Sequence, residues 1–149
     1  MDTSELAQSF IARTLPKAQW THEAHLRVGL WHALRHPEHE TLALLRERIS
    51  LYNAAVGGEN TATAGYHESI TRFYVTLFYA YLATADAGRS PRELETGLIE
   101  RYGDRELPLR YYHRETLFSS AARLGWVEPD LAPLPRGAAL PQGAALPQK

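Results

Sequence analysis

The sequence predicts an all-α fold, a compact bundle of five to six helices, because three observations agree. Apolar residues recur at helical spacing along most of the chain, and no segment alternates with the period of a strand. Helix-stop and helix-start residues separate the helical segments. The 149 residues, 44% of them hydrophobic, suffice for one domain with a single core. We therefore expect a helical domain over residues 1–126 and an extended tail, rich in proline and alanine, over residues 127–149.

The first three helices are expected at residues 3–13, 21–36 and 37–56. The dipeptide Leu15-Pro16 is expected to end the first helix, because proline cannot continue it. Thr21 is the expected N-cap of the second helix, because its hydroxyl can accept a hydrogen bond from a free backbone N–H. Pro37 fits the first position of the third helix, and Gly57 follows its last turn as a stop signal.

Three more helices are expected at residues 64–86, 91–102 and 112–124. The first of these has a high β propensity around residues 73–81, but its length and its single apolar face favour a helix. That face consists of Ile70, Tyr74, Leu77, Phe78 and Tyr81. The next helix has a complete start signal, with Ser90 at the N-cap, Pro91 at the first position and Glu93 at the third.

The C-terminal tail differs in composition from the rest of the chain. Residues 127–135 are rich in proline, so we expect them to run extended across the surface. The hexapeptide Gly-Ala-Ala-Leu-Pro-Gln then occurs at residues 137–142 and again at 143–148. Two copies are too few for a solenoid, so the tail is expected to be either disordered or docked through Leu140 and Leu146.

Charge and composition exclude several functions. The net charge is −1, with 16 basic and 17 acidic residues, which is not the basic footprint of a nucleic-acid binder. The arginines at 101, 105, 110 and 114 alternate with acids and are interpreted as a mixed solvated surface. The absence of cysteine excludes disulfides, thiolate metal sites and a cysteine nucleophile. No apolar run approaches the ~18–20 residues that span a bilayer, so we expect a cytoplasmic protein with no membrane partner. Self-association into a homodimer stays open.

Two short segments, residues 20–26 and 65–71, carry the most reactive side chains. At about 100° per residue, His22 falls on the apolar stripe of its helix and His25 at the edge of that stripe. His67 falls in the middle of the apolar face of the fourth expected helix. The other histidines on the second and third helices, His32, His36 and His39, are expected at the surface near the opposite end of the bundle.

A simple topology brings the two segments together. Short connections favour antiparallel neighbours, so the second, third and fourth helices are expected to run up, down and up. Their ends then meet at one end of the bundle, unless the loop at 57–65 carries the fourth helix across it. The side chains expected at this end are those of His22, His25, Tyr52, Asn53, Tyr66, His67 and Glu68.

This clustering predicts a metal centre. The positive end of a helix disfavours imidazolium, so histidines in first turns tend to be neutral, which is the form that binds metals. The predicted ligands of a divalent metal ion, zinc or iron, are His22, His25 and His67. Known metal motifs are absent, because the histidines of His22-Glu-Ala-His25 lie three positions apart instead of four and no Glu-x-x-His pair follows.

The first functional hypothesis is a small metal-dependent enzyme that acts on a small organic molecule. Its predicted catalytic residues are Glu68, Tyr66 and Tyr52, and its predicted substrate-binding residues are Asn53, Tyr74 and Thr71. A second hypothesis is a metal-free acid–base enzyme or small-molecule-binding module that uses His67 and Glu68. A third is a non-enzymatic interaction protein with structural histidines, and a fourth is a haem protein with an inward histidine as axial ligand.

The motifs also resemble those of a known family. They are Trp20-x-His-x-x-His-Leu26, Tyr52-Asn53, Asn60-Thr61, Tyr66-His-Glu-x-Ile-Thr71 and Trp126-Val-Glu-Pro-Asp-Leu-x-Pro-Leu-Pro135. Together, over residues 18–135, they resemble a family of small helical bacterial proteins. The resemblance implies that His22, His25, Tyr66, His67, Glu68 and Thr71 belong to the family signature. It implies no reaction, because that family has no established activity.

Overall fold

The computed structural model describes residues 1–134, and all the regular structure in that range is helical. The elements are α1 (Thr3–Ile11), η1 (Lys17–Gln19), α2 (His22–Ala33), α3 (Glu38–Ala55), α4 (Glu68–Thr84), α5 (Pro91–Tyr102), η2 (Leu107–Arg110), α6 (Arg114–Leu117) and α7 (Ser120–Leu124), where η marks a 3-10 helix. The predicted all-α class is confirmed. The described range holds seven α-helices instead of five to six, because the segment expected as one helix at 112–124 forms two.

Capping groups set the helix boundaries. Thr21 caps α2 as predicted, accepting a hydrogen bond from the N–H of Ala24 at 3.2 Å. Ser90 and Glu93 form the predicted capping box at the start of α5. The break between α6 and α7 has the same cause, because Ser119 starts a new helix as its N-cap.

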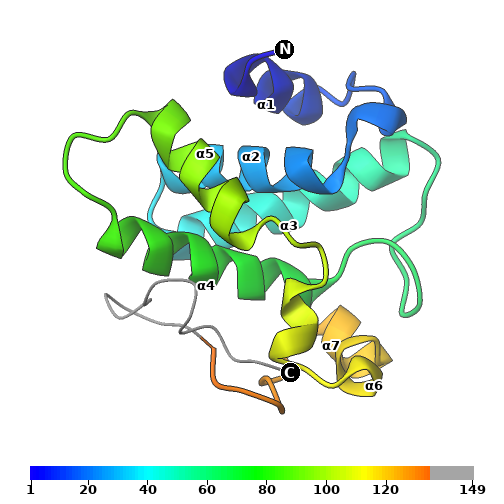
Figure 1. Ribbon diagram of the computed structural model, residues 1–149. Helices are drawn as coiled ribbons and strands as arrows, with labels where there is room; N and C mark the ends of the chain where they lie inside the picture. The colour runs from blue at the N-terminus through cyan, green and yellow to red at the C-terminus, as the bar shows by residue number, and fades with distance from the viewer. Residues whose placement is uncertain (135–149) are drawn as a thin grey trace.

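The central helices have the predicted up-down-up arrangement. Figure 1 shows α2, α3 and α4 side by side and antiparallel in sequence order, so that the start of α2, the end of α3 and the start of α4 lie at one side of the molecule. Helix α1 covers α2 and α3, and α5 crosses in front of the central layer (Figure 1). The loop after α3 does not carry α4 across the bundle.

Two apolar clusters form the core. The larger one joins α2, α4 and α5 to η2 and α6, and includes Leu30, Phe73, Leu98 and Tyr111. The smaller one lies under α1 and joins it to α2 and α3. Residue Tyr52, predicted to be catalytic, lies in this smaller cluster, fully buried.

The first part of the C-terminal tail, up to residue 134, has no regular secondary structure and is held against the helices by hydrogen bonds. The N–H of Val127 donates to the hydroxyl of Ser69 at 3.1 Å, and the hydroxyl of Tyr112 donates to the carbonyl of Val127 at 2.6 Å. The repeated hexapeptides at 137–142 and 143–148 lie outside the described residues. Among the described residues, the helices are too short or too polar to cross a membrane.

Candidate functional site

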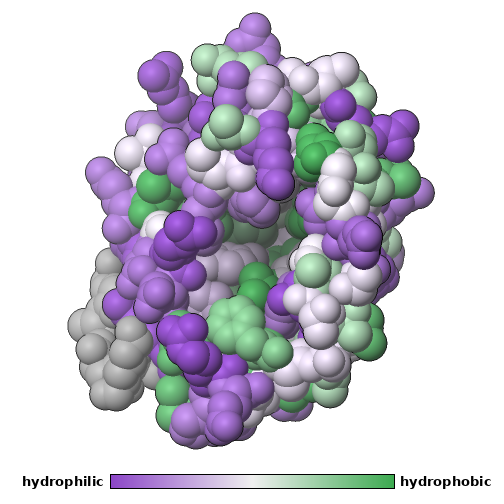
Figure 2. Space-filling model, turned by 90° about the vertical axis from the view of Figure 1, so that its right-hand side faces the viewer, coloured by the Kyte–Doolittle hydropathy of each residue, from purple (hydrophilic) through white to green (hydrophobic). Residues whose placement is uncertain are grey.

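A cavity of about 620 Å³ lies between α2, α4 and the η2–α6 segment. Figure 2 shows it as a hollow in the middle of one face, with apolar surface inside and a mostly polar rim. Its apolar wall consists of Leu26, Val28, Gly29, Leu45, Ile49, Ile70, Phe78, Pro108, Leu109, Leu117 and Phe118. The polar and aromatic side chains around it are those of Trp20, Thr21, His22, His25, Thr71, Tyr74, Arg105, Glu106 and Arg114. Four of the predicted site residues therefore share one cavity, namely His22, His25, Thr71 and Tyr74.

His25 has a fixed orientation at the edge of the cavity. Its Nδ1 lies 2.6 Å from the carbonyl oxygen of Thr21, and its ring stacks on Trp20 with a centroid distance of 3.9 Å. Because a carbonyl only accepts, Nδ1 carries the proton and Nε2 keeps its lone pair. His25 retains an accessible surface where it lines the cavity, yet the surrounding protein atoms desolvate the ring and lower its pKa to about 4. It therefore presents a neutral imidazole with a free acceptor nitrogen at pH 7.

His22 and Tyr74 contribute two buried polar atoms without a protein partner. Their rings meet edge to face at 6.0 Å, and neither His22 Nε2 nor the Tyr74 hydroxyl has a hydrogen bond among the described residues. Burial lowers the pKa of His22 and raises that of Tyr74, so both side chains are neutral at pH 7. A buried polar atom without a partner costs about 1–3 kcal/mol. Both atoms are closed to solvent, so they lie behind the surface of the cavity wall and lower stability without facing the cavity directly.

His67 does not take part in the cavity. Its Nδ1 accepts a hydrogen bond from the N–H of Ile70 at 3.1 Å, which makes it the N-cap of α4. Its Nε2 lies 2.6 Å from the carbonyl of Leu117, so Nε2 carries the proton and donates it. Both ring nitrogens are therefore occupied, and burial lowers the pKa of the imidazole. His67 can act neither as a metal ligand nor as a base in this arrangement.

Glu68 and Tyr66 lie in a second, shallower groove. The Glu68 carboxylate receives hydrogen bonds from Arg46 Nε at 2.9 Å and Arg46 Nη2 at 2.6 Å, and from the Tyr66 hydroxyl at 2.8 Å. The bonds from Arg46 are the main reason that the pKa of Glu68 lies below its usual value. The groove also contains Arg72 and Trp126, whose ring lies 4.6 Å from the guanidinium carbon. The predicted catalytic pair is thus part of an ion-pair network that joins α3 to α4.

The last two predicted site residues are structural. The buried hydroxyl of Tyr52 donates to the carbonyl of Leu15 at 2.8 Å, which fastens the end of α3 to the segment after α1. The amide of Asn53 donates to the side chain of Asn60 at 3.1 Å, and so holds the loop after α3. Neither lines the cavity.

The structure therefore does not support the predicted three-histidine metal centre. Within residues 1–134, no group of three or more histidine, aspartate or glutamate side chains is placed to hold a metal ion. The physical reason is that His67 uses both nitrogens for backbone groups, while Glu68 is held by Arg46. Only His22 and His25 of the predicted ligands line the cavity, and two imidazoles fall short of the three protein ligands usual for catalytic zinc.

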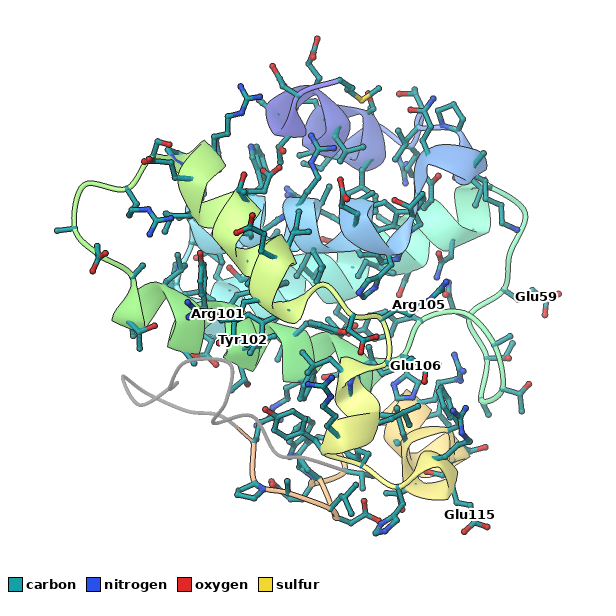
Figure 3. The ribbon with its side chains drawn as sticks, in the orientation of Figure 1. Glu59, Arg101, Tyr102, Arg105, Glu106 and Glu115 are labelled. Atoms are coloured by element: carbon teal, nitrogen blue, oxygen red, sulfur yellow. The ribbon has the colours of Figure 1, made fainter. Side chains whose placement is uncertain are left out.

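Sequence reasoning missed two arginines of the cavity and one buried histidine. The alternation of Arg105 and Arg114 with acids predicts a mixed surface, and both residues are exposed, but both also line the cavity. Arg105 and Glu106 lie on the loop between α5 and η2 (Figure 3). The spacing of apolar residues predicts helices but does not predict where a loop lies relative to them. His32, expected at the surface, is fully buried, between the carbonyl of Val28 and Arg48.

Comparison of the chain with family models, curated proteins and solved structures gives no match. The resemblance of its motifs to a family of small helical bacterial proteins therefore stays a prediction, and the functional assignment rests on the geometry of the cavity.

Proposed function

We propose that this protein binds a small organic molecule in the cavity between α2, α4 and η2, using its own side chains to hold it. One observation carries the proposal: a cavity of about 620 Å³ combines an apolar wall with a few fixed polar groups. Ligand sites in proteins are typically concave, mostly apolar and about 300–1,000 Å³ in volume, with a small number of placed polar groups. The small-molecule ligand is the one expected from the sequence. The side chains that hold it are those of the cavity, in place of a metal ion, His67 and Glu68.

The polar groups of the wall define how the ligand is held. His25 offers an acceptor nitrogen whose tautomer is set by the carbonyl of Thr21. His22 Nε2 and the Tyr74 hydroxyl are closed to solvent, so they do not contact a molecule in the cavity directly. His25 is therefore the histidine that a ligand can reach.

A variant that fills the cavity tests this proposal. Thr71 lines the cavity, and its hydroxyl donates to the carbonyl of His67, the N-cap of its own helix, and interacts with the side chain of Tyr66 just before that helix. Thr71→Phe therefore adds bulk to the cavity at the cost of local contacts around the start of α4. Thr84→Phe is the matched control, because Thr84 is exposed on the same helix, bonds its own helix in the same way and lies outside this cavity.

The measurement is a thermal-shift screen of small aromatic and aliphatic compounds, followed by titration of the hits by isothermal calorimetry. Compounds that bind the natural chain should lose about tenfold or more in affinity in Thr71→Phe and keep their affinity in Thr84→Phe. Trp20 lines the cavity, so its fluorescence should change on binding. Hits whose affinity is the same in all three proteins would show that the cavity is not the binding site.

A second candidate function is acid–base catalysis on the bound molecule. It is favoured by His25, because an imidazole whose Nδ1–H is held by a carbonyl and whose Nε2 is free has the form of a general base. In that case His25→Gln should abolish conversion of a bound compound, followed by NMR, even at compound concentrations that saturate the variant. If compounds bind but are not converted, acid–base catalysis is contradicted and the protein is a binding module.

A further inference from the structure

The mouth of the cavity has an excess of positive charge. Arg105 and Arg114 line it on one side, against the single carboxylate of Glu106. All three side chains belong to exposed residues, and Figure 3 shows Arg105 and Glu106 on the loop that precedes η2, beside the cavity. The Arg114 guanidinium lies 5.7 Å from the ring centre of Phe118, another residue of the wall.

Among residues 1–134, Arg105 has neither an ion pair nor a ring contact, unlike several other arginines of the structure. Arg27 pairs with Glu95, Arg46 with Glu68 and Arg110 with Asp104. Arg105 makes no hydrogen bond or ion pair with any residue from 1 to 134. The acid beside it in the chain, Asp104, is engaged, since its carboxylate accepts from the N–H of Glu106 at 2.9 Å and lies 3.6 Å from Arg110.

Arg105 also acts on the interior of the cavity. After burial, its positive charge is the next cause of the lowered pKa of His22, so the guanidinium lies close enough to His22 for their charges to interact. The carboxylate of Asp104, which pairs with Arg110, acts on the same imidazole in the opposite direction and to a smaller extent. The five N–H groups of a guanidinium suit a carboxylate, which they can bind with two parallel hydrogen bonds. An unpaired guanidinium above an apolar hollow is complementary to a molecule with an apolar body and one anionic end.

We propose that the ligand of this cavity is an amphipathic organic anion, with its apolar body against α2 and α4 and its carboxylate on Arg105. This inference rests on the proposed function and adds the chemical class of the ligand. Arg114 increases the positive potential at the mouth, and Glu106 disfavours molecules with a second negative group at the same end. Neutral compounds of the same shape lack the contact with Arg105 and should bind more weakly.

Matched pairs of probes test the inference. We would titrate the full chain with 4-phenylbutanoate and its primary amide, and with octanoate and octanamide, by isothermal calorimetry at low and moderate salt. Each carboxylate should bind about tenfold more tightly than its amide, because a charge-assisted hydrogen bond is stronger than a neutral one. The difference should shrink as salt is added, since the mouth is exposed.

Variants assign the effect to Arg105. Arg105→Gln should reduce the preference for carboxylate over amide to less than about twofold, because the carboxylate loses more affinity than the amide, and Arg105→Lys should retain part of the preference. Arg92→Gln is the matched control, because Arg92 is exposed on α5 and lies outside this cavity.

The outcomes separate this inference from the proposed function. If amides bind as tightly as carboxylates, or if Arg105→Gln leaves the preference intact, the anionic class is wrong while the cavity remains a binding site. If neither the carboxylates nor their amides bind, the inference of an amphipathic organic anion is wrong. The compound screen with Thr71→Phe then decides whether the cavity binds other molecules. A phosphate or sulfonate of the same body that outcompetes the carboxylate would also overturn the choice of head group.

Discussion

His67 has the sequence pattern expected of a functional-site residue, but in the structure its side chain stabilises the fold. It lies on the inward face of its segment, as its spacing predicts, and it is buried. Its two nitrogens connect the first turn of α4 to the last residue of α6, through the N–H of Ile70 and the carbonyl of Leu117. Loss of the imidazole would leave one free N–H at a helix start and one unpaired buried carbonyl.

The substitution His67→Ala should therefore destabilise the protein and leave the cavity intact. We expect the free energy of unfolding to fall by about 2–4 kcal/mol, about 1 for the lost cap and the rest for the unpaired carbonyl. Urea unfolding followed by circular dichroism measures it. His39→Ala is the control, because His39 is exposed and should change stability by less than about 0.5 kcal/mol. A loss of ligand binding in folded His67→Ala, without a loss of stability, would contradict the structural role.

Tyr52 and Asn53 illustrate the same limit of sequence reasoning. The sequence places both at the correct end of α3, next to the start of α4, and the structure agrees. Spacing along a helix predicts which face a residue occupies but not which backbone group comes within reach of it. The Tyr52 hydroxyl donates a hydrogen bond to the carbonyl of Leu15, 37 residues away in sequence. The local sequence pattern does not predict that contact.

At the scale of elements, the ion pair between Arg46 and Glu68 connects α3 to α4. The pair is bidentate, with bonds of 2.9 and 2.6 Å, and the Tyr66 hydroxyl supports the same carboxylate. The Glu68 side chain is 11% exposed and that of Arg46 is 49% exposed, so solvent screens the pair on one side. Its contribution should thus exceed that of a surface pair and stay below that of a fully buried one.

A double-mutant cycle measures this contribution. Arg46→Ala, Glu68→Gln and the double variant should give a coupling energy of about 1 kcal/mol in urea unfolding. Arg46→Lys should lose most of it, since a lysine cannot form the two parallel bonds. The pair Arg27 and Glu95, joined at 2.9 Å between α2 and α5, offers a comparison with both side chains 21% exposed. A coupling energy near zero would contradict this structural role of the ion pair between Arg46 and Glu68.

For the molecule as a whole, the sequence predicted the class and the topology better than the site. Helical periodicity and the caps at Thr21 and Ser90 are local, so they could be interpreted from the chain directly. The antiparallel order of α2, α3 and α4 follows from short loops. The cavity depends on the segment that runs from Arg105 to Phe118, which folds back beside the start of α2. The position of this segment depends on packing between residues that are distant in sequence, so residue spacing along the chain does not predict it.

Buried neutral histidines give the whole molecule a predictable response to acid. His32 is fully buried, with Nδ1 2.8 Å from the carbonyl of Val28 and Nε2 2.8 Å from Nη1 of Arg48. Nδ1 therefore carries the proton and Nε2 accepts from Arg48, an arrangement that only the neutral ring can make. Burial, and to a smaller extent the charges of Arg48, Arg35 and His36, lower the pKa of His32 to about 4. The ring of His36, 6.4 Å away, faces it from the end of α2.

The folded protein should lose stability as the pH falls from 6.5 to about 4. The pKa of His32 in the folded state lies below the ordinary value of 6.5, so within this window the unfolded chain binds more protons, and acid favours unfolding. The loss from His32 alone should be on the order of 2–3 kcal/mol. The pKa values of His22, His25 and His67 are also lowered, and add to the loss in the same direction.

The substitution His32→Gln separates the share of His32 from that of the other histidines. A glutamine side chain has both a donor for the carbonyl of Val28 and an acceptor for Arg48, but it does not titrate. Urea unfolding at pH 7.5, 5.5 and 4.5 should show a smaller fall in stability for His32→Gln than for the natural chain. The exposed His39→Gln should retain the full fall. Equal slopes in all three proteins would mean that His32 is protonated in the folded state without penalty, and that its contact with Arg48 opens at acid pH.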